Sequence, residues 1–170
     1  MSVESVEAFL KQNEKDIEIL TFGDTSTVAK AAEALGVTPG EIAKSLLFKV
    51  KDDFVMIIMA GDKRLDNRKF KDLFNAKAKM PEPKEVVVAT GHPVGGVCPF
   101  GLKQSIPIYL DYSLQSYSYV FPAAGAPNTA IKLTIDELFE LTHGQWVDVI
   151  QSEIPDQDKV VKNIRYLMNT

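Results

Sequence analysis

The stretch SLLFKVKDDFVMIIMA, residues 45–60, decides which fold the chain can form. Its two halves are apolar runs with a polar interruption at Asp52 and Asp53. Short apolar runs that are rich in β-branched and aromatic residues and are joined by a polar turn are typical of a β-hairpin. The sequence therefore predicts two core strands, residues 45–50 and 54–60, that pair with each other.

The segment ahead of this hairpin suggests a rival fold. Residues 28–35 predict a helix that stops at Gly36, and residues 38–41, Thr-Pro-Gly-Glu, have the pattern of a capping box with proline at the first helical position. Two short helices this close together resemble a DNA-binding helix-turn-helix over residues 31–44. A recognition helix, however, continues for about three turns with polar residues that enter the major groove. Because the sequence turns apolar at Ser45, a buried strand over residues 45–50 would exclude DNA binding.

Short helices and strands alternate along the rest of the chain. Apolar spacing, caps and turn residues predict helices at residues 2–13, 66–75, 81–90 and 134–143, and strands at residues 17–22, 76–80, 106–111, 117–121, 129–133 and 146–150. In the helix at residues 81–90, Val86 to Val88 are expected to be buried. The pattern predicts one α+β domain, residues 1–152, with a mixed β-sheet that can curl into a barrel-like form.

A further helix is expected in the C-terminal extension, residues 153–170. Beyond Pro155, apolar residues at helical spacing form a single stripe, made of Val160, Val161, Ile164, Leu167 and Met168. Such a stripe needs a surface to pack on, either on the same domain or on a second subunit of a homodimer.

Composition limits the class of protein. The chain has 170 residues, 45% hydrophobic and 25% charged, which suits one globular domain. Its longest apolar run is far shorter than the ~20 residues of a membrane span, and the first ten residues carry two glutamates where a signal peptide needs basic residues. We therefore expect a cytoplasmic protein without membrane association. One cysteine and two histidines exclude an internal disulfide and a zinc module, so no metal or cofactor is expected.

Charge is unevenly distributed in this acidic chain, whose formal net charge is -4. Residues 63–84 contain eight basic and three acidic residues, a local balance of +5. A basic segment of this kind can steer a phosphate-bearing partner toward one face, although it can equally be a solvated surface.

Residues 90–101, TGHPVGGVCPFG, hold four glycines and two prolines, so they predict a shaped loop rather than a helix or strand. This loop could be held against a second one, residues 123–128, or it could be a rigid connector. His92 and Cys98 suggest a thiol nucleophile, but that chemistry needs an oriented base and a lowered thiol pKa, so a packed cysteine is the simpler reading. His143 follows a predicted helix, where a structural role is expected.

Lys44 lies where the predicted capped helix ends and a core strand begins. A lysine at such a junction can face a pocket, where it can bind a phosphate or orient a polarised carbonyl group. The alternative is an ordinary surface lysine.

Several short motifs occur together in one order along the chain. They are Thr27-Val28-Ala29, Leu35-Gly36-Val37, Ile42-Ala43-Lys44-Ser45-Leu46, Gly61-Asp62-Lys63-Arg64-Leu65, Pro93-Val94-Gly95-Gly96-Val97-Cys98-Pro99 and Ala124-Gly125. Over residues 3–150 the chain thereby resembles the YbaK/prolyl-tRNA-synthetase-associated domain family. The resemblance implies a mixed, barrel-like β-sheet flanked by helices and the activity of a trans-editing aminoacyl-tRNA deacylase. It also implies aminoacyl-tRNA as the partner, with prolyl-tRNA synthetase or a translation elongation factor as further candidates.

The resemblance further implies a site. Lys44 takes the place of the functional lysine of the family, at the 3′ end of the tRNA, and water or a group of the substrate attacks the ester. Amides of Gly95, Gly96 and Val97 would support the oxyanion, in a pocket lined also by Cys98, Pro99, Ala124 and Gly125. Further pocket candidates are Phe22, Thr25, His92 and Asn128, and candidates for binding the tRNA are Lys63, Arg64 and Arg68.

The chain departs from the cysteinyl-tRNA deacylases of that family at two places. Val97-Cys98-Pro99 replaces Cys-Ser-Pro, and Ala123-Ala124-Gly125 replaces Ser-Ala-Gly. The missing serine favours alanine or another small amino acid on tRNA-Pro over cysteine. A non-catalytic binder of tRNA ends or nucleotides on the same fold is the alternative.

Overall fold

The predicted hairpin forms the centre of the structure, a computed structural model that describes residues 2–152. β2 (Ile42–Val50) and β3 (Asp53–Ala60) pair antiparallel from Ala43 opposite Ala60 to Val50 opposite Asp53. β2 begins three residues earlier than predicted. The expected terminal helix at residues 153–170 lies outside the described residues.

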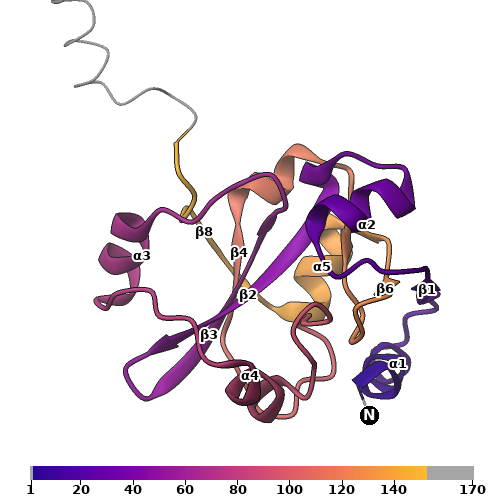
Figure 1. Cartoon of the computed structure of the whole chain (residues 1–170), viewed down its shortest axis with the longest axis horizontal. Coiled ribbons are helices and arrows are strands. Elements are labelled where there is room, and N and C mark those ends of the chain that lie inside the picture. The colour runs from indigo at the N-terminus through magenta and orange to yellow at the C-terminus, as the bar shows by residue number, and fades with distance from the viewer. Residues whose placement is uncertain (1, 153–170) are drawn as a thin grey trace, which may run out of the picture.

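Six strands form a mixed sheet in the order β7, β5, β2, β3, β4, β8. Figure 1 shows its central strands β2, β3 and β4, with β8 beside β4. The outer strands are β4 (Ile108–Asp111), β5 (Tyr119–Pro122), β7 (Leu133–Thr134) and β8 (Gln145–Val147). β5 runs parallel to β2, and β4 runs parallel to both β3 and β8, while β7 is antiparallel to β5. The predicted α+β class with a mixed sheet is confirmed.

Some predicted strands are shorter or divided. The strand predicted at residues 129–133 splits into β6 (Thr129–Ala130), which pairs with β1 (Leu20–Thr21), and β7, which joins the large sheet. Residues 76–80 contribute only a single bridge, between Lys49 and Lys79. These segments differ from the prediction because their pairing depends on distant partners that local sequence does not identify.

Alternate residues of the hairpin point into two separate cores. Met56 and Ile58 belong to a large core that also contains side chains from α1 (Ser2–Gln12), α4 (Pro83–Thr90) and α5 (Ile135–Thr142). Ile57 and Met59 pack on the opposite face with Phe70 of α3 (Asn67–Phe74). α2 (Val28–Leu35) forms a third, smaller cluster with the start of β2 and with β5. Both faces of the hairpin are thus covered, as its continuous apolar sequence requires.

Helix boundaries follow the capping residues. Thr27 caps α2 by accepting a hydrogen bond from the Lys30 amide, and Gly36 ends that helix in the left-handed region at φ 68°. Asp66 caps α3, and Thr134 opens α5 with a complete capping box.

The prediction of buried side chains in α4 was wrong for two residues, since Val87 is 46% and Val88 59% exposed. A helix of two turns presents only one side to the core, and here Val86, Ala89 and Thr90 occupy it.

The helix-turn-helix reading was also wrong. Residues Pro39–Glu41 form a single 3-10 turn, η1, which keeps the predicted capping box between Thr38 and Glu41. The chain then enters β2, where Ile42, Ala43, Leu47 and Phe48 are buried. With a core strand in place of a recognition helix, these residues cannot enter a DNA groove.

Among the helices of residues 2–152, none has the length and apolar character of a membrane span.

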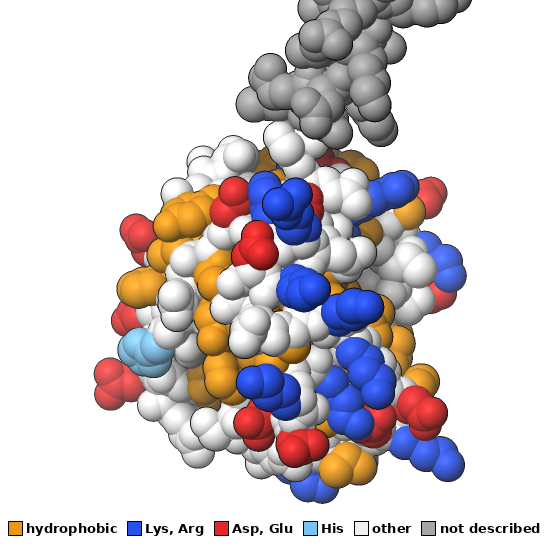
Figure 2. Space-filling view, turned by 90° about the vertical axis from the view of Figure 1, so that its left-hand side faces the viewer, with side chains coloured by type: hydrophobic (Ala, Val, Ile, Leu, Met, Phe, Trp, Pro, Cys, Tyr) orange, Lys and Arg blue, Asp and Glu red, His pale blue; other side chains and the backbone are white. Residues whose placement is uncertain are grey.

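Basic side chains gather on the face formed by α3 and the β2–β3 hairpin. Figure 2 views the molecule from this side and shows Lys and Arg side chains mainly over its centre and right-hand part, with exposed apolar side chains beside them. Arg64, Arg68 and Lys71 are exposed, and Lys63 is half-buried. Lys69 is partly neutralised, since its ammonium lies 3.0 Å from the Asp148 carboxylate.

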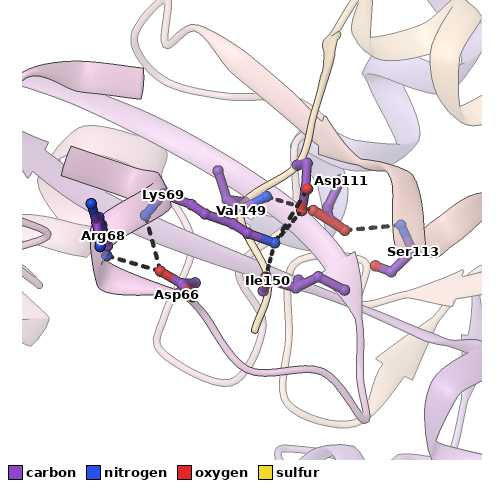
Figure 3. A network of polar contacts seen from close by, with 8 residues as sticks. Asp66, Arg68, Lys69, Asp111, Ser113, Val149 and Ile150 are labelled. Carbon is purple, nitrogen blue, oxygen red and sulfur yellow. Dashed lines mark hydrogen bonds and ion pairs between the residues drawn. The ribbon is translucent and has the colours of Figure 1, made fainter. Parts of the chain in front are cut away.

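A buried carboxylate holds the end of the domain in place (Figure 3). Asp111, at the end of β4, is fully buried and accepts hydrogen bonds from the amides of Ser113 (2.9 Å) and Val149 (3.0 Å). The Ser113 hydroxyl in turn accepts from the Ala60 amide at 3.1 Å. The Asp111 side chain therefore joins β4, the turn after it and the segment that follows β8.

We expect Asp111→Asn to destabilise the domain by about 1–3 kcal/mol, because one carboxylate oxygen becomes an amide NH₂ that faces a main-chain N–H. Urea unfolding followed by circular dichroism measures this change. Asp148→Asn is the matched control: its carboxylate is exposed, and we expect a loss under about 1 kcal/mol. Equal stability losses in the two variants would contradict the structural role of Asp111.

Candidate active site

A cavity of about 290 Å³ opens along one edge of β2. It is bounded by β2, by α2 with the segment before it, by the loop around Gly95, and by the residues that follow β5. The residues that line it are Thr25, Ser26, Thr27, Val28, Ala31, Ile42, Ala43, Lys44, Ser45, Leu46, Leu47, Met80, Pro81, Val86, Val94, Gly95, Val97, Phe121, Ala123, Thr129 and Ala130.

The cavity exists because β2 has an incomplete neighbour on this edge. β3 pairs with β2 along nearly its whole length, whereas β5 pairs only with Ile42 and Ala43. The next contact on that edge is the bridge to Lys79, made by Lys49. On this edge, residues 44–47 therefore border the cavity instead of a strand.

Two glycine-containing loops, 90–101 and 123–128, form the opposite wall by contact of main chain with main chain. The Gly125 amide donates a hydrogen bond to the Gly96 carbonyl at 3.0 Å, which confirms that the first loop is held against the second. A Cβ atom on Gly96 would lie 2.6 Å from the Ala126 nitrogen, so a larger residue cannot stand there without moving the loops apart. The Thr25 amide and hydroxyl both donate to the Pro127 carbonyl, which fastens the segment before α2 to the same loop.

Lys44 lies on β2 at the border of the cavity. Its ammonium group donates hydrogen bonds to the main-chain carbonyls of Lys63 and, at 3.4 Å, Gly61. Burial lowers the pKa of Lys44 below its ordinary value; the charge of Asp62 opposes this shift and that of Arg64 adds to it. The turn after β3 thus fixes a half-buried cation beside the cavity.

The main-chain amides of the first glycine loop are not equivalent. The Gly96 amide donates to the Pro93 carbonyl at 2.9 Å, which closes a turn and removes this amide from the set available to an oxyanion. Gly95 and Val97 both line the cavity, and their amides have no hydrogen-bond partner among the described residues. Gly95 adopts φ 92°, a conformation that favours glycine.

His92 and Cys98 lie inside the core rather than on the cavity. His92 is fully buried; its Nε2 donates to the Phe100 carbonyl at 2.7 Å, and its Nδ1 accepts from the Ser2 hydroxyl at 2.5 Å. Burial raises the pKa of the Cys98 thiol to about 12. A thiol with such a pKa is protonated at neutral pH, which agrees with a packed cysteine and not with a nucleophile.

The remaining predicted residues have varied positions. Thr25 and Val97 line the cavity together with Lys44 and Gly95. Ala124 and Gly125 are buried in the second loop, behind the lining residue Ala123. Outside the set of lining residues are Phe22, whose amide donates to the Asn128 carbonyl, and Pro99, which borders a different surface hollow beside α1.

Sequence reasoning missed several lining residues. Ser45 lies on the strand face of Ala43 and Leu47, and its hydroxyl is buried without a hydrogen-bond partner in the described part of the chain. A polar residue at an inward position of an apolar strand was a usable signal. Met80, Pro81 and Val86 reach the cavity only through tertiary packing, which local sequence does not reveal.

Residues 2–152 contain no group of three or more His, Cys, Asp or Glu side chains placed to hold a metal ion.

The fold has a clear counterpart among solved structures. A crystal structure described as that of "a putative trans-editing enzyme for prolyl tRNA synthetase" matches with a TM-score of 0.83 and 31% sequence identity, over 88% of this chain and 97% of that chain. The fold is thus that of an editing hydrolase, a curled mixed sheet with helices around it.

The family follows from the sequence comparison. The sequence model of the aminoacyl-tRNA editing domain matches residues 23–141, and the chain belongs to this family. Editing of an aminoacyl-tRNA is hydrolysis of its ester bond, so the protein is an aminoacyl-tRNA deacylase. The matched region contains β2, both glycine loops and every residue that lines the cavity.

Two relatives extend over nearly the same length. The Bacillus subtilis protein YwhH, described as uncharacterized, is 44% identical over 152 residues, 88% of this chain and 97% of the relative. An Enterococcus faecalis protein named "Putative Cys-tRNA(Pro)/Cys-tRNA(Cys) deacylase EbsC" is 31% identical over 141 residues, 82% of this chain and 86% of the relative.

The buried His92 predicts a stability loss on mild acidification. Burial lowers its pKa below the ordinary value, so the unfolded chain binds a proton at a pH where the folded protein does not, and stability falls as the pH decreases. Between about pH 7.5 and about pH 6, the free energy of unfolding should decrease more in the wild type than in His92→Gln. Urea unfolding at both pH values measures this change. Equal decreases in the free energy of unfolding of the two proteins would show that protonation of His92 does not cause the stability loss.

Proposed function

We propose that this protein is a trans-acting deacylase of tRNA-Pro that carries alanine or another small amino acid. The observation that carries the proposal is the cavity itself. It is lined by a half-buried lysine on β2 and by Gly95 and Val97, whose amides have no hydrogen-bond partner within residues 2–152. Its lining is mostly apolar and contains small residues such as Ala43, Ala123 and Ala130. A pocket of this kind excludes a larger side chain sterically better than it rejects a smaller one.

The proposed chemistry depends on positioning rather than on a nucleophilic side chain. An aminoacyl ester is already activated compared with an amide, so water, oriented by a hydroxyl of the terminal ribose, can attack its carbonyl carbon. The ester oxygen then leaves as the protonated ribose hydroxyl, and the free amino acid is released. In this mechanism the amides of Gly95 and Val97 stabilise the oxyanion. The Lys44 ammonium, held by the carbonyls of Gly61 and Lys63, binds the terminal phosphate or hydroxyl of the tRNA.

The proposed substrate combines two kinds of support. The similar solved structure is named for prolyl-tRNA synthetase, which favours tRNA-Pro. The Enterococcus relative is named for cysteinyl esters, whereas this chain has Val97 and Ala123 in place of the polar residues of the cysteinyl-tRNA deacylases. Alanine is therefore our first choice. Lys63, Arg64 and Arg68, near Lys44 or on α3, are proposed to contact the tRNA backbone, and prolyl-tRNA synthetase or an elongation factor is proposed as the protein that delivers it.

A panel of labelled aminoacyl-tRNAs tests the substrate. We expect tRNA-Pro charged with alanine to be hydrolysed fastest, seryl and cysteinyl esters more slowly, and the prolyl ester to be spared by a factor of about 100, because steric exclusion applies to the larger ring. Release of the labelled amino acid is the measurement. Binding without release of any amino acid would favour the non-catalytic alternative.

Substitution of Lys44 tests the proposed centre. Lys44→Met keeps the aliphatic stem but removes the charge, and we expect kcat/KM on the preferred ester to fall by about 100-fold or more. Lys11→Met makes the same chemical change on α1, away from the cavity, and should leave kcat/KM within about twofold. Circular dichroism of both variants verifies folding. Unchanged deacylation by a folded Lys44→Met protein would contradict the assignment of Lys44 to the active site.

A further inference from the structure

The open edge of β2 presents main-chain polar groups to the cavity. The Lys49 amide bonds to the Lys79 carbonyl, away from β3, at 2.8 Å. In an antiparallel pair, N–H and C=O groups of successive residues point alternately to the two edges. Those of Ser45 and Leu47 therefore point to the same edge as those of Lys49, and both residues line the cavity. Neither residue has a hydrogen bond on that edge to a described residue.

The cavity offers no carboxylate to a positively charged ligand group. None of its described lining residues is Asp or Glu, and Lys44 is a cation. An aminoacyl ester nevertheless carries a free α-amino group, which must find hydrogen-bond acceptors when the ester is bound. The acceptors on the β2 side are the carbonyls of Ser45 and Leu47 and the Ser45 hydroxyl, which is buried without a partner among residues 2–152.

We propose that the open β2 edge, at residues 45–47, is the receptor for the α-amino group of the ester. This inference rests on the proposed function and specifies its substrate class. The amino group donates to the main-chain carbonyls of Ser45 and Leu47, as the next strand of the sheet would have done. Esters with a free amino group are accepted, while peptidyl and other N-acylated esters are rejected because their nitrogen has lost donors and gained bulk.

A series of esters on one tRNA-Pro separates recognition of the amino group from exclusion by size. The series contains alanyl, lactyl, propionyl and N-acetylalanyl esters, and each enzymatic rate is divided by the spontaneous hydrolysis rate of the same ester. Propionate is no larger than alanine but lacks the donor, so steric exclusion predicts no loss for it. We expect its normalised kcat/KM to be lower by about 100-fold, since a site built for a polar group rejects the analogue that lacks it. Equal normalised values for alanyl and propionyl esters would overturn the proposal.

A binding measurement keeps this test separate from the deacylase assignment. Stable 3′-amide analogues of the alanyl and propionyl esters, made on an RNA minihelix that ends in 3′-amino-3′-deoxyadenosine, are compared by fluorescence anisotropy. Tighter binding of the alanyl amide, by about 10-fold or more, supports the receptor even if no ester is hydrolysed. Equal binding of both analogues contradicts it, whatever the hydrolytic activity.

The variant Ser45→Ala distinguishes the main chain from the hydroxyl group. It removes the side-chain oxygen and leaves both carbonyls in place, so we expect the preference for alanyl over propionyl ligands to persist within about threefold. Loss of this preference in a folded Ser45→Ala protein would assign the amino group to the hydroxyl and overturn the main-chain receptor.

Discussion

The structure depends on one interrupted strand pairing. β5 pairs with β2 at only two residues, whereas β3 pairs with β2 from Ala43 to Val50. The hairpin therefore stays paired although part of one edge lacks a neighbouring strand, and the space beside that edge forms the cavity. Lys44 borders this space because it is the first residue after the last pair with β5.

Close contact between glycine loops keeps the other wall at a fixed distance. Gly96 lies against the main chain of Gly125 and Ala126, and α1 adds a second set of contacts from behind. A Cβ atom on Gly125 would lie 2.8 Å from the Ser2 carbonyl oxygen, and one on Gly101 would lie 2.5 Å from that of Ser5. The start of α1 therefore supports both loops, together with the hydrogen bond from Ser2 to His92. The first helix thus contributes to the shape of the cavity although none of its side chains lines it.

Much of this arrangement was predictable, and the exceptions share a physical cause. Local residue preferences determine the hairpin, the shaped loop and the caps of α2, α3 and α5, so these features could be predicted from the sequence. The positions of Cys98 and Pro99 depend on how a loop without regular periodicity turns. The resemblance implied that both line the pocket, whereas neither is among the described residues that line the cavity. The open edge could not be predicted either, because the register and length of the parallel pairing between β2 and β5 depend on residues 79 positions apart in the chain, such as Ile42 and Phe121. The position of Lys44 at a strand start made it a candidate, and the family resemblance supplied its role, while only the structure distinguished the Gly96 amide from those of its neighbours.

The edge of β2 also has a bearing on how such a site can change over evolutionary time. Main-chain carbonyls are present whatever side chains the strand carries, so point mutations at Ser45 or Leu47 alter the volume of the cavity without removing these acceptors. Substitutions of Val97 or Ala123, which also line the cavity, would change its volume in the same way. If the β2 edge receives the α-amino group as proposed, one scaffold can acquire different amino acid preferences by single substitutions, while the group that all amino acids share keeps the same main-chain acceptors.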